Sequence, residues 1–306
     1  MDHPKSKLKI HRPPNRRRLR GGIEGAMHAL FLICGIIAIG FVLVISIYLI
    51  ISGLPTIREI GLTDFLFGRE WESTDKTDPR FGILPFILTS IYGTAGAVVI
   101  GVPIGFLTAV FLSKAAPAGP AAVMRTAVDM LAGVPSVVYG LVGMIVLVPA
   151  IRRAFDLPAG DSLLAAIIVL AVMILPSIIS VSETALKAVP REYEEGSLAL
   201  GATDAETWLR VSAPAAKSGI AASVVLGVGR AVGEAMAILM VAGNAANMPG
   251  LLTSVKFLTT AIASEMSYAS VGSLQRNALF SIGLVLFLFI MLINVLLNLI
   301  LKKERE

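Results

Sequence analysis

Cysteine, histidine and a nucleotide-binding motif are scarce or missing in this sequence. Cys34 is the single cysteine, so a disulfide within the chain and a thiolate metal site are both excluded. The three histidines, at positions 3, 11 and 28, all come before the apolar core of the first hydrophobic run, so no histidine-based catalytic centre is expected further along. The pattern Gly-x4-Gly-Lys-Ser/Thr does not occur, and we therefore expect no nucleotide hydrolysis by that route.

Charged residues are also few, and apolar residues are correspondingly abundant. Charged residues make up 15% of the chain and hydrophobic residues 56%, against about 25% and about 45–50% in soluble domains. One soluble core cannot bury that excess, so the composition predicts an all-α polytopic membrane protein. The net charge of +5 comes from basic residues clustered in a few segments, which does not indicate nucleic-acid binding.

Long apolar runs predict six transmembrane helices, the first of them an uncleaved anchor. They lie at 27–52, 84–112, 122–150, 162–182, 218–243 and 277–301. Residues 1–26 form a basic tail with eight Lys and Arg side chains, which the positive-inside rule places in the cytoplasm. The polar segment 53–83 is then an extracytoplasmic loop, and residues 302–306 are a cytoplasmic end. The spans contain prolines and glycines that predict kinks and close helix contacts, among them Pro135, Pro176, Gly101, Gly105, Gly133, Gly229 and Gly233.

The stretch from Pro190 to Pro214 is the one long amphipathic passage in the second half of the chain. Pro190 is suited to the first position of a helix, and Gly201 to a left-handed end of that helix. Thr203 and Glu206 have the capping-box spacing of a second short helix, which Pro214 would end. The stretch therefore predicts a helix, a tight turn and a helix at a membrane surface.

The spacing of this stretch resembles the EAA loop of ABC importer permeases. Glu195-Gly196-Ser197 is followed by three residues, Gly201, nine residues and Val211-Ser212-Ala213-Pro214, with substitutions at both alanines, the Ile and the Leu of the family pattern. The resemblance implies a cytoplasmic coupling loop over 183–217 that docks on a partner ATPase dimer. Its candidate coupling residues are Glu194, Glu195, Gly201, Thr203, Val211 and Pro214. The alternative is an ordinary amphipathic loop between two spans.

Two charged side chains, Arg230 and Glu234, fall inside the fifth predicted span. Each would cost about 2.5–3.5 kcal/mol near the bilayer centre, so both must face protein or water. Four residues apart on a helix, they are expected to stack and to pair. The planar guanidinium of Arg230 has several N–H donors and suits a tetrahedral oxyanion, so one interpretation is an anion pathway. The other interpretation is a structural ion pair. Arg125 and Asp129 form a similar pair near the cytoplasmic edge of the third span, where a structural role is expected.

Three further stretches extend the resemblance over residues 27–301. They are GRAVGEAMA at 229–237, LAGVPSVVYG at 131–140, and FGREW followed by FGILPFI at 67–87. Together they look like the phosphate-specific ABC permease of PstC type. The resemblance implies a type I importer fold over 84–301, with Arg230 and Glu234 on the substrate pathway, in the bacterial inner membrane with both termini cytoplasmic. It also implies a second permease of PstA type, an extracytoplasmic phosphate-binding protein, and ATP used by the partner ATPase, with no cofactor held by this chain.

Other functions remain open at this stage. A permease for molybdate or sulfate would share the loop, although those permeases generally lack the Arg-x3-Glu span. A secondary transporter or channel would need no coupling loop, and an intramembrane hydrolase would need paired aspartates or a Ser–His dyad. Whether the permease pair is mixed or identical is also open.

Overall fold

The computed structural model describes residues 15–75 and 77–303, so most of the predicted basic tail and the last residues lie outside the described part. Residues up to Ile50 and residues from Ile51 onward form two units. The first unit is the main part of helix α1 (Asn15–Ile60). Its apolar side chains, such as Phe31 and Phe41, are exposed along the helix. That surface has to be covered by lipid or by protein.

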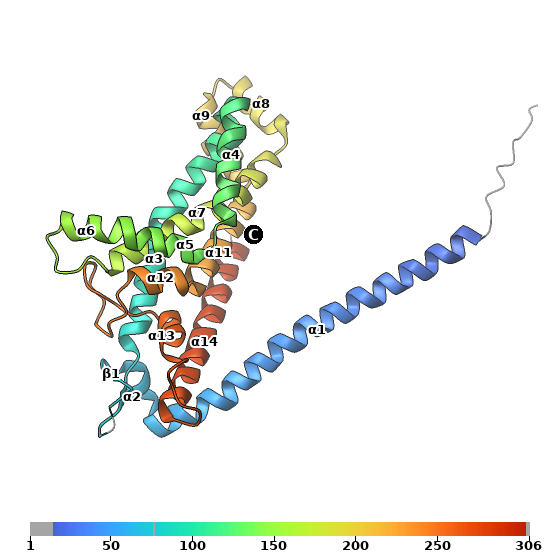
Figure 1. The fold of residues 1–306 in the computed structure, drawn as a ribbon. Helices are drawn as coiled ribbons and strands as arrows, with labels where there is room; N and C mark the ends of the chain where they lie inside the picture. The colour runs from blue at the N-terminus through green and yellow to red at the C-terminus, as the bar shows by residue number, and fades with distance from the viewer. Residues whose placement is uncertain (1–14, 76, 304–306) are drawn as a thin grey trace, which may run out of the picture. The chain divides into compact units, whose positions relative to one another are not determined.

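The second unit is built from helices joined by short connections, with one small hairpin (Figure 1). Strand β1 (Trp71–Glu72) pairs antiparallel with β2 (Arg80–Phe81), with Trp71 opposite Phe81. The helical segments are α2 (Leu62–Phe67), α3 (Leu84–Val110), η1 (Phe111–Ala115), α4 (Ala118–Gly133), α5 (Ser136–Val142), η2 (Gly143–Leu147), α6 (Val148–Ala154), α7 (Leu163–Lys187), α8 (Arg191–Ala199), α9 (Asp204–Thr207), η3 (Trp208–Ser212), α10 (Ala213–Ala215), α11 (Lys217–Gly233), α12 (Met236–Val241), α13 (Leu258–Glu265) and α14 (Leu274–Lys303). The three η segments are π-helical turns.

Helix α7 is the centre of the packing, and it lies against both α3 and α11. It begins at a serine cap, where Ser162 Oγ accepts a hydrogen bond from the Ala165 amide. Gly101 and Gly105 of α3 face Ile174 and Ile178 of α7, so closely that an added Cβ would come within 3 Å of an isoleucine carbon. The small residues thus let the two helices approach, as the sequence predicted.

The helices confirm most of the predicted spans. In the described part of the chain, five helices are long and apolar enough to cross a membrane, and a sixth span arises if the bent pair Asp204–Ala215 and Lys217–Gly233 is one span. The predicted spans 84–112, 162–182 and 277–301 each correspond to one continuous helical run. Pro103 and Pro176 lie within α3 and α7 without ending them.

Two predicted spans are interrupted, which corrects the expectation of six unbroken helices. The span at 122–150 breaks at Val134 and Pro135, because Val134, the residue before the proline, takes an extended conformation and α5 begins only after Pro135. The span at 218–243 ends at Gly233, and Glu234 is extended. The helices after the two breaks, α5 and α12, pack against each other. Gly133, Gly229 and Gly233, expected to sit in helix contacts, have open space where a Cβ would be.

The two ends of the second unit carry different structures. Helices α8 and α9 lie at one end, and α2 with the β1–β2 hairpin lies at the other (Figure 1). Because α3 and the other long helices run between them, the two ends belong to opposite faces of the membrane. The segment 53–83 is more ordered than the predicted loop: α1 continues to Ile60, and α2 and the hairpin follow.

Candidate functional site

The passage after α7 forms the predicted helix, turn and helix. Helix α8 ends ahead of Gly201, which has a φ of 87°, the left-handed conformation that glycine adopts without strain. The Thr203 hydroxyl accepts a hydrogen bond from the Glu206 amide, and the Glu206 carboxylate accepts one from the Thr203 amide. This reciprocal capping box starts α9 directly after the turn.

The two prolines of this passage differ from their predicted roles. Pro190 is the residue before α8 rather than its first helical residue. Pro214 does not end the second helix, since α10 continues to Ala215 and the chain bends by 75° between Ala215 and Lys217. The π-helical turn η3 ends at Ser212, two residues before Pro214, and its wider turn leaves room for a ring that would clash in an α-helix.

Two adjacent glutamates of α8 point in different directions. Glu195 is exposed, as a side chain that meets another subunit would be. Glu194 turns inward: its Oε1 forms an ion pair with Lys114 Nζ and accepts a hydrogen bond of 2.8 Å from Ser212 Oγ. The Lys114 and Glu194 side chains are only 11% and 20% exposed. Within the predicted coupling set, Glu194 therefore has an internal contact and Glu195 has none.

The environment of Glu194 keeps its carboxylate charged. Burial raises its pKa, but the hydrogen bonds from Lys114 and Ser212 and the nearby cations outweigh burial and hold the pKa below its ordinary value. A cavity of about 390 Å³ opens beside this contact and is lined by Lys114, Glu194, Glu195, Leu198 and Trp208 among others. Trp208 itself packs on the ends of α3 and α7. The passage is therefore attached to the membrane helices by both charge and packing.

Large apolar side chains project from the outer side of this passage. Leu200, directly before the turn glycine, is 91% exposed, and Tyr193, Leu198 and Leu209 are also exposed. Val211 is half-buried, while Thr203 and Pro214 are exposed. Exposed apolar residues with a polar surround are typical of a surface that binds another protein.

Arg230 and Glu234 lie beside the break between α11 and α12, and they are not paired. Within the described residues, the Arg230 side chain makes one polar contact, a long one of 3.5 Å from Nη1 to Ser177 Oγ. The Glu234 carboxylate accepts a hydrogen bond of 3.0 Å from the Ala237 amide and so caps α12. The predicted pairing is therefore wrong, because Glu234 is already outside the helix that carries Arg230.

Arg230 lies on the open side of α11. Leu226 and Gly233, four residues before it and three after it on the helix, are exposed, and so is the adjacent Gly229. Gly227, Val228, Ala231 and Val232 are buried. Its side chain is half-buried. A guanidinium at this depth cannot face lipid without a large cost, so this side of α11 meets water or another protein in the membrane.

Arg125 also has a different partner from the one predicted. Its Nε donates to Glu183 Oε1 at 2.5 Å, and its Nη2 donates to the Leu112 carbonyl at 2.7 Å. Lys187 reaches the same Glu183 oxygen at 2.7 Å. The expected structural role is supported, but the contact joins α4 to α7 and η1 rather than Arg125 to Asp129.

Sequence reasoning missed Lys114, Ser212 and Ser177. Lys114 is 80 residues from Glu194 along the chain, counting from 114 to 194, and Ser177 is 53 residues from Arg230. No spacing rule connects such positions. Ser177 directly follows Pro176, so the predicted kink in that span was the one signal that pointed near it.

The chain is similar in sequence and in fold to known permeases of ABC transporters. A probable ABC transporter permease protein, YqgH, of Bacillus subtilis is 42% identical over 270 residues, which cover 86% of this chain and 87% of that protein. The phosphate transport system permease protein PstC of Haemophilus influenzae is 35% identical over 284 residues, covering 86% and 88%. A structure of the MetNI methionine ABC transporter in an inward-facing conformation matches the fold with a TM-score of 0.54 at 20% identity, over 73% of this chain and 94% of that one.

These matches agree with the geometry above: a bundle of spans, a helix–turn–helix at one end, and no nucleotide-binding motif. The fold is that of type I ABC importer permeases. Residues 101–305 match the family described as the binding-protein-dependent transport system inner membrane component. The chain therefore belongs to this family, as the membrane-spanning permease component of an ABC importer and not its ATPase.

Proposed function

We propose that this permease imports inorganic phosphate and that Arg230 contacts the anion on its way through the membrane. The observation that carries the proposal is the position of Arg230: half-buried, on the open side of α11, beside a helix break, and with one long contact to Ser177. A planar guanidinium with free donors suits a tetrahedral oxyanion.

The pathway then runs along the open side of α11, at the interface with a second permease subunit. Gly229 and Gly233 leave space on that side. Glu234 contributes by capping α12 and keeping the break open, and not by neutralising Arg230. An unpaired arginine retains a positive potential for an anion, which a tight ion pair would cancel. We assign the neighbouring subunit to the paralogous PstA type.

The passage 183–217 is proposed as the coupling loop that meets the ATPase dimer. Leu200 and its exposed neighbours supply an apolar contact, and Glu195 supplies a charge. This assignment puts α8 and α9 in the cytoplasm, and with them both chain termini. The α2 and hairpin end then lies outside, where the binding protein delivers its substrate.

The choice of phosphate rests on relatives whose names specify phosphate transport, at 30–35% identity. The relative at 42% identity is named only as a probable ABC permease. Uptake of labelled phosphate, sulfate and molybdate by cells that carry the whole importer tests the choice. We expect ATP-dependent uptake of phosphate, and Arg230→Lys should reduce it about tenfold with the complex assembled, since the charge stays but the fork is lost.

Ser180→Ala, a change to a half-buried serine elsewhere on α7, is the matched control for expression and assembly. If the wild-type importer takes up sulfate or molybdate in preference to phosphate, the substrate assignment is wrong. If Arg230→Lys transports phosphate at the wild-type rate per assembled complex, Arg230 is not on the pathway.

A further inference from the structure

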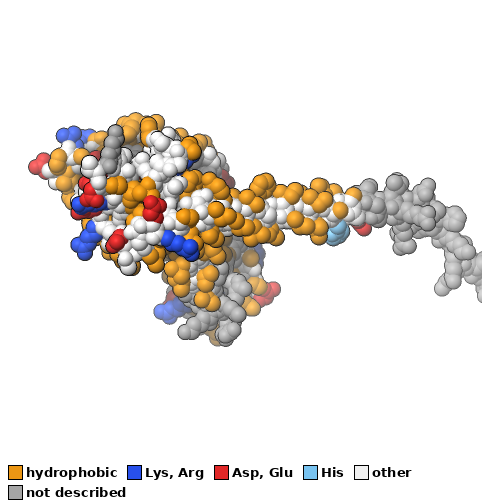
Figure 2. Space-filling model, turned by 90° about the horizontal axis from the view of Figure 1, so that it is seen from below, with side chains coloured by type: hydrophobic (Ala, Val, Ile, Leu, Met, Phe, Trp, Pro, Cys, Tyr) orange, Lys and Arg blue, Asp and Glu red, His pale blue; other side chains and the backbone are white. Residues whose placement is uncertain are grey.

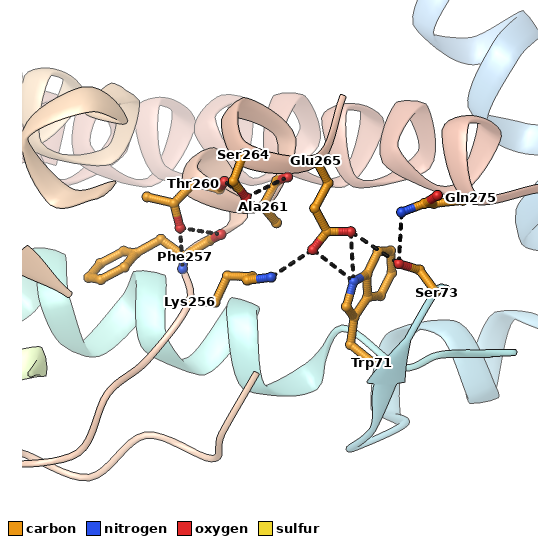
Figure 3. Close-up of polar contacts among 9 residues, drawn as sticks. All are labelled: Trp71, Ser73, Lys256, Phe257, Thr260, Ala261, Ser264, Glu265 and Gln275. Atoms are coloured by element: carbon orange, nitrogen blue, oxygen red, sulfur yellow. Dashed lines mark hydrogen bonds and ion pairs between the residues drawn. The ribbon is translucent and has the colours of Figure 1, made fainter. Parts of the chain in front are cut away.

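Side chains from separate segments meet around Glu265 at the end of the unit that carries the β1–β2 hairpin (Figure 3). Trp71 Nε1 donates to both Glu265 carboxylate oxygens at 3.1 Å, and Ser73 Oγ donates to one of them at 3.1 Å. Lys256 Nζ approaches the other oxygen at 2.6 Å. Gln275 of α14 donates to Ser73 Oγ at 3.1 Å. The hairpin, the segment before α13, α13 itself and α14 are therefore joined through one carboxylate.

The Glu265 network is shielded from water. Lys256 and Glu265 are 12% and 16% exposed, and Trp71 is buried. The Trp71 ring packs edge-on against Phe81 and Phe86. A shielded and fully bonded ion pair holds its segments in a single arrangement. The network also gives a structural role to the tryptophan of the FGREW stretch, which the transport pathway leaves unexplained.

The loop 266–273 begins at this network and is held at both ends. The amides of Tyr268 and Ala269 both donate to the Glu265 carbonyl at 3.1 Å. Arg276 Nη1 donates to the Ala269 carbonyl at 3.1 Å, and the Ala269 side chain is buried. The loop is therefore ordered before any partner arrives, which lowers the entropy cost of binding.

Two large side chains project from this ordered loop. Tyr268 and Val271 are each 88% exposed, a value that only Leu200 exceeds among the large apolar side chains in the described part of the chain. Both lie ahead of Leu274, where the last candidate span begins, so they belong to the segment outside that span. Tyrosine on a rigid support is a frequent anchor of protein–protein interfaces.

A cavity of about 730 Å³ lies beside the loop, with Tyr268, Glu72 and Asp75 in its lining. Hydrogen bonds from Thr77 and Asp78 hold the pKa of Asp75 below its ordinary value, so this carboxylate stays charged. Lys256 and Glu265 in the same lining neutralise each other. The charges that remain in the lining, from Glu72 and Asp75, are acidic; Lys76 lies outside the described residues. Figure 2 shows this end, with acidic and basic side chains among the hydrophobic ones.

We propose that loop 266–273 and the acidic lining beside it are the docking surface for the importer's extracytoplasmic binding protein. An apolar patch on that protein would cover Tyr268 and Val271, and a Lys or Arg beside the patch would meet Glu72 and Asp75. The family requires a binding protein, and this surface lies at the opposite end from α8 and α9. The proposal rests on the proposed orientation, in which this end is outside.

The test uses the whole importer in lipid nanodiscs, titrated with its purified binding protein loaded with phosphate, and measures stimulated ATP hydrolysis. We expect Tyr268→Ala with Val271→Ala to raise the half-stimulating concentration of binding protein about tenfold, as loss of an interface anchor does. Hydrolysis without binding protein should not change. Ser267→Ala, at an exposed position of the same loop, is the matched control and should behave as wild type.

The contribution of the acidic lining is tested by Asp75→Lys. Glu59→Lys is the control, because Glu59 is exposed and lines a different cavity. Asp75→Lys should weaken stimulation and Glu59→Lys should not. An unchanged half-stimulating concentration in the Tyr268/Val271 variant, or an equal rise with Ser267→Ala, overturns the proposal. A photo-crosslinker at position 268 should link the binding protein, and a link to the second permease instead also overturns it.

These experiments test the phosphate assignment and the docking surface independently of each other. If the binding protein of this importer carries another solute, it is loaded with that solute and the titration is repeated. The phosphate assignment is then wrong, while the comparison between the loop variants and their controls still decides the docking surface.

Discussion

One carboxylate oxygen of Glu194 binds both Lys114 and Ser212, and these two residues belong to two different π-helical turns. Lys114 lies in η1 at the end of α3, and Ser212 lies in η3 on the way to α11. Inserted π-turns are often found at functional positions, where a helix changes register. A movement of α8 would therefore pull on both α3 and α11 through Glu194.

Breaking this contact should uncouple ATP hydrolysis from uptake. Glu194→Gln leaves Lys114 largely buried without a counter-charge, at a cost of about 2 kcal/mol. We expect phosphate uptake per ATP hydrolysed to fall about fivefold, because displacement of α8 no longer moves the membrane helices. Uptake and hydrolysis are measured together in proteoliposomes, with Glu192→Gln, an exposed position of the same helix, as control. Normal coupling in Glu194→Gln would show that the contact transmits nothing.

The same contact predicts a pH dependence of stability. The pKa of Glu194 lies below its ordinary value of 4.5 in the folded chain, so the contact stabilises the fold fully above that ordinary value. The stabilisation is lost as the pH falls through the lowered folded pKa. Thermal unfolding of wild type and Glu194→Gln should therefore differ most near neutral pH and converge only as the pH falls well below the ordinary value of 4.5. A difference that is constant down to acid pH would contradict this linkage.

The exposed Leu200 should matter for assembly with the ATPase. Leu200→Asp places a charge where we expect an apolar contact, and the amount of ATPase that co-purifies with the permease should fall about tenfold. Ala205→Asp adds the same charge at an exposed position of the same passage and should leave co-purification unchanged. Equal losses in both variants would mean that charge alone disturbs assembly.

Arg230 and Glu234 should behave independently, since they are not paired. Arg230→Gln should lose uptake with the complex intact, whereas Glu234→Gln should lower stability by about 1 kcal/mol through weaker capping of α12. The double variant should show the sum of the two effects. Thermal stability and uptake per assembled complex are compared in all three variants. Restoration of either property in the double variant would indicate the ion pair that the structure lacks.

The Glu265 network should contribute to stability at the other end of the unit. Glu265→Gln removes the counter-charge of Lys256 and should destabilise the purified importer by about 3 kcal/mol. Trp71→Phe keeps an aromatic ring but removes the indole donor, so a smaller loss of about 1 kcal/mol is expected. Asp78→Asn, an exposed change in the same segment, is the control. If the thermal unfolding temperature of Glu265→Gln equals that of the wild type, the network does not stabilise the fold.

Local features of the coupling passage could be predicted from the sequence because they depend on neighbouring residues. The left-handed turn at Gly201 follows from the absence of a Cβ, and the capping box from the spacing of Thr203 and Glu206. The positions of three continuous spans follow from the length of the apolar runs. The resemblance in motif spacing likewise led to the family that the comparisons establish.

Contacts between distant residues were decided only by the tertiary structure. The i to i+4 spacing of Arg230 and Glu234 predicts a pair only if the helix continues, and its end at Gly233 depends on how α12 packs on α5. Arg125 prefers Glu183 to Asp129 because α4 lies against α7. Hydropathy and spacing describe one segment at a time. Which side chains share a buried carboxylate, as Lys114 and Ser212 share Glu194, depends on the packing of whole helices.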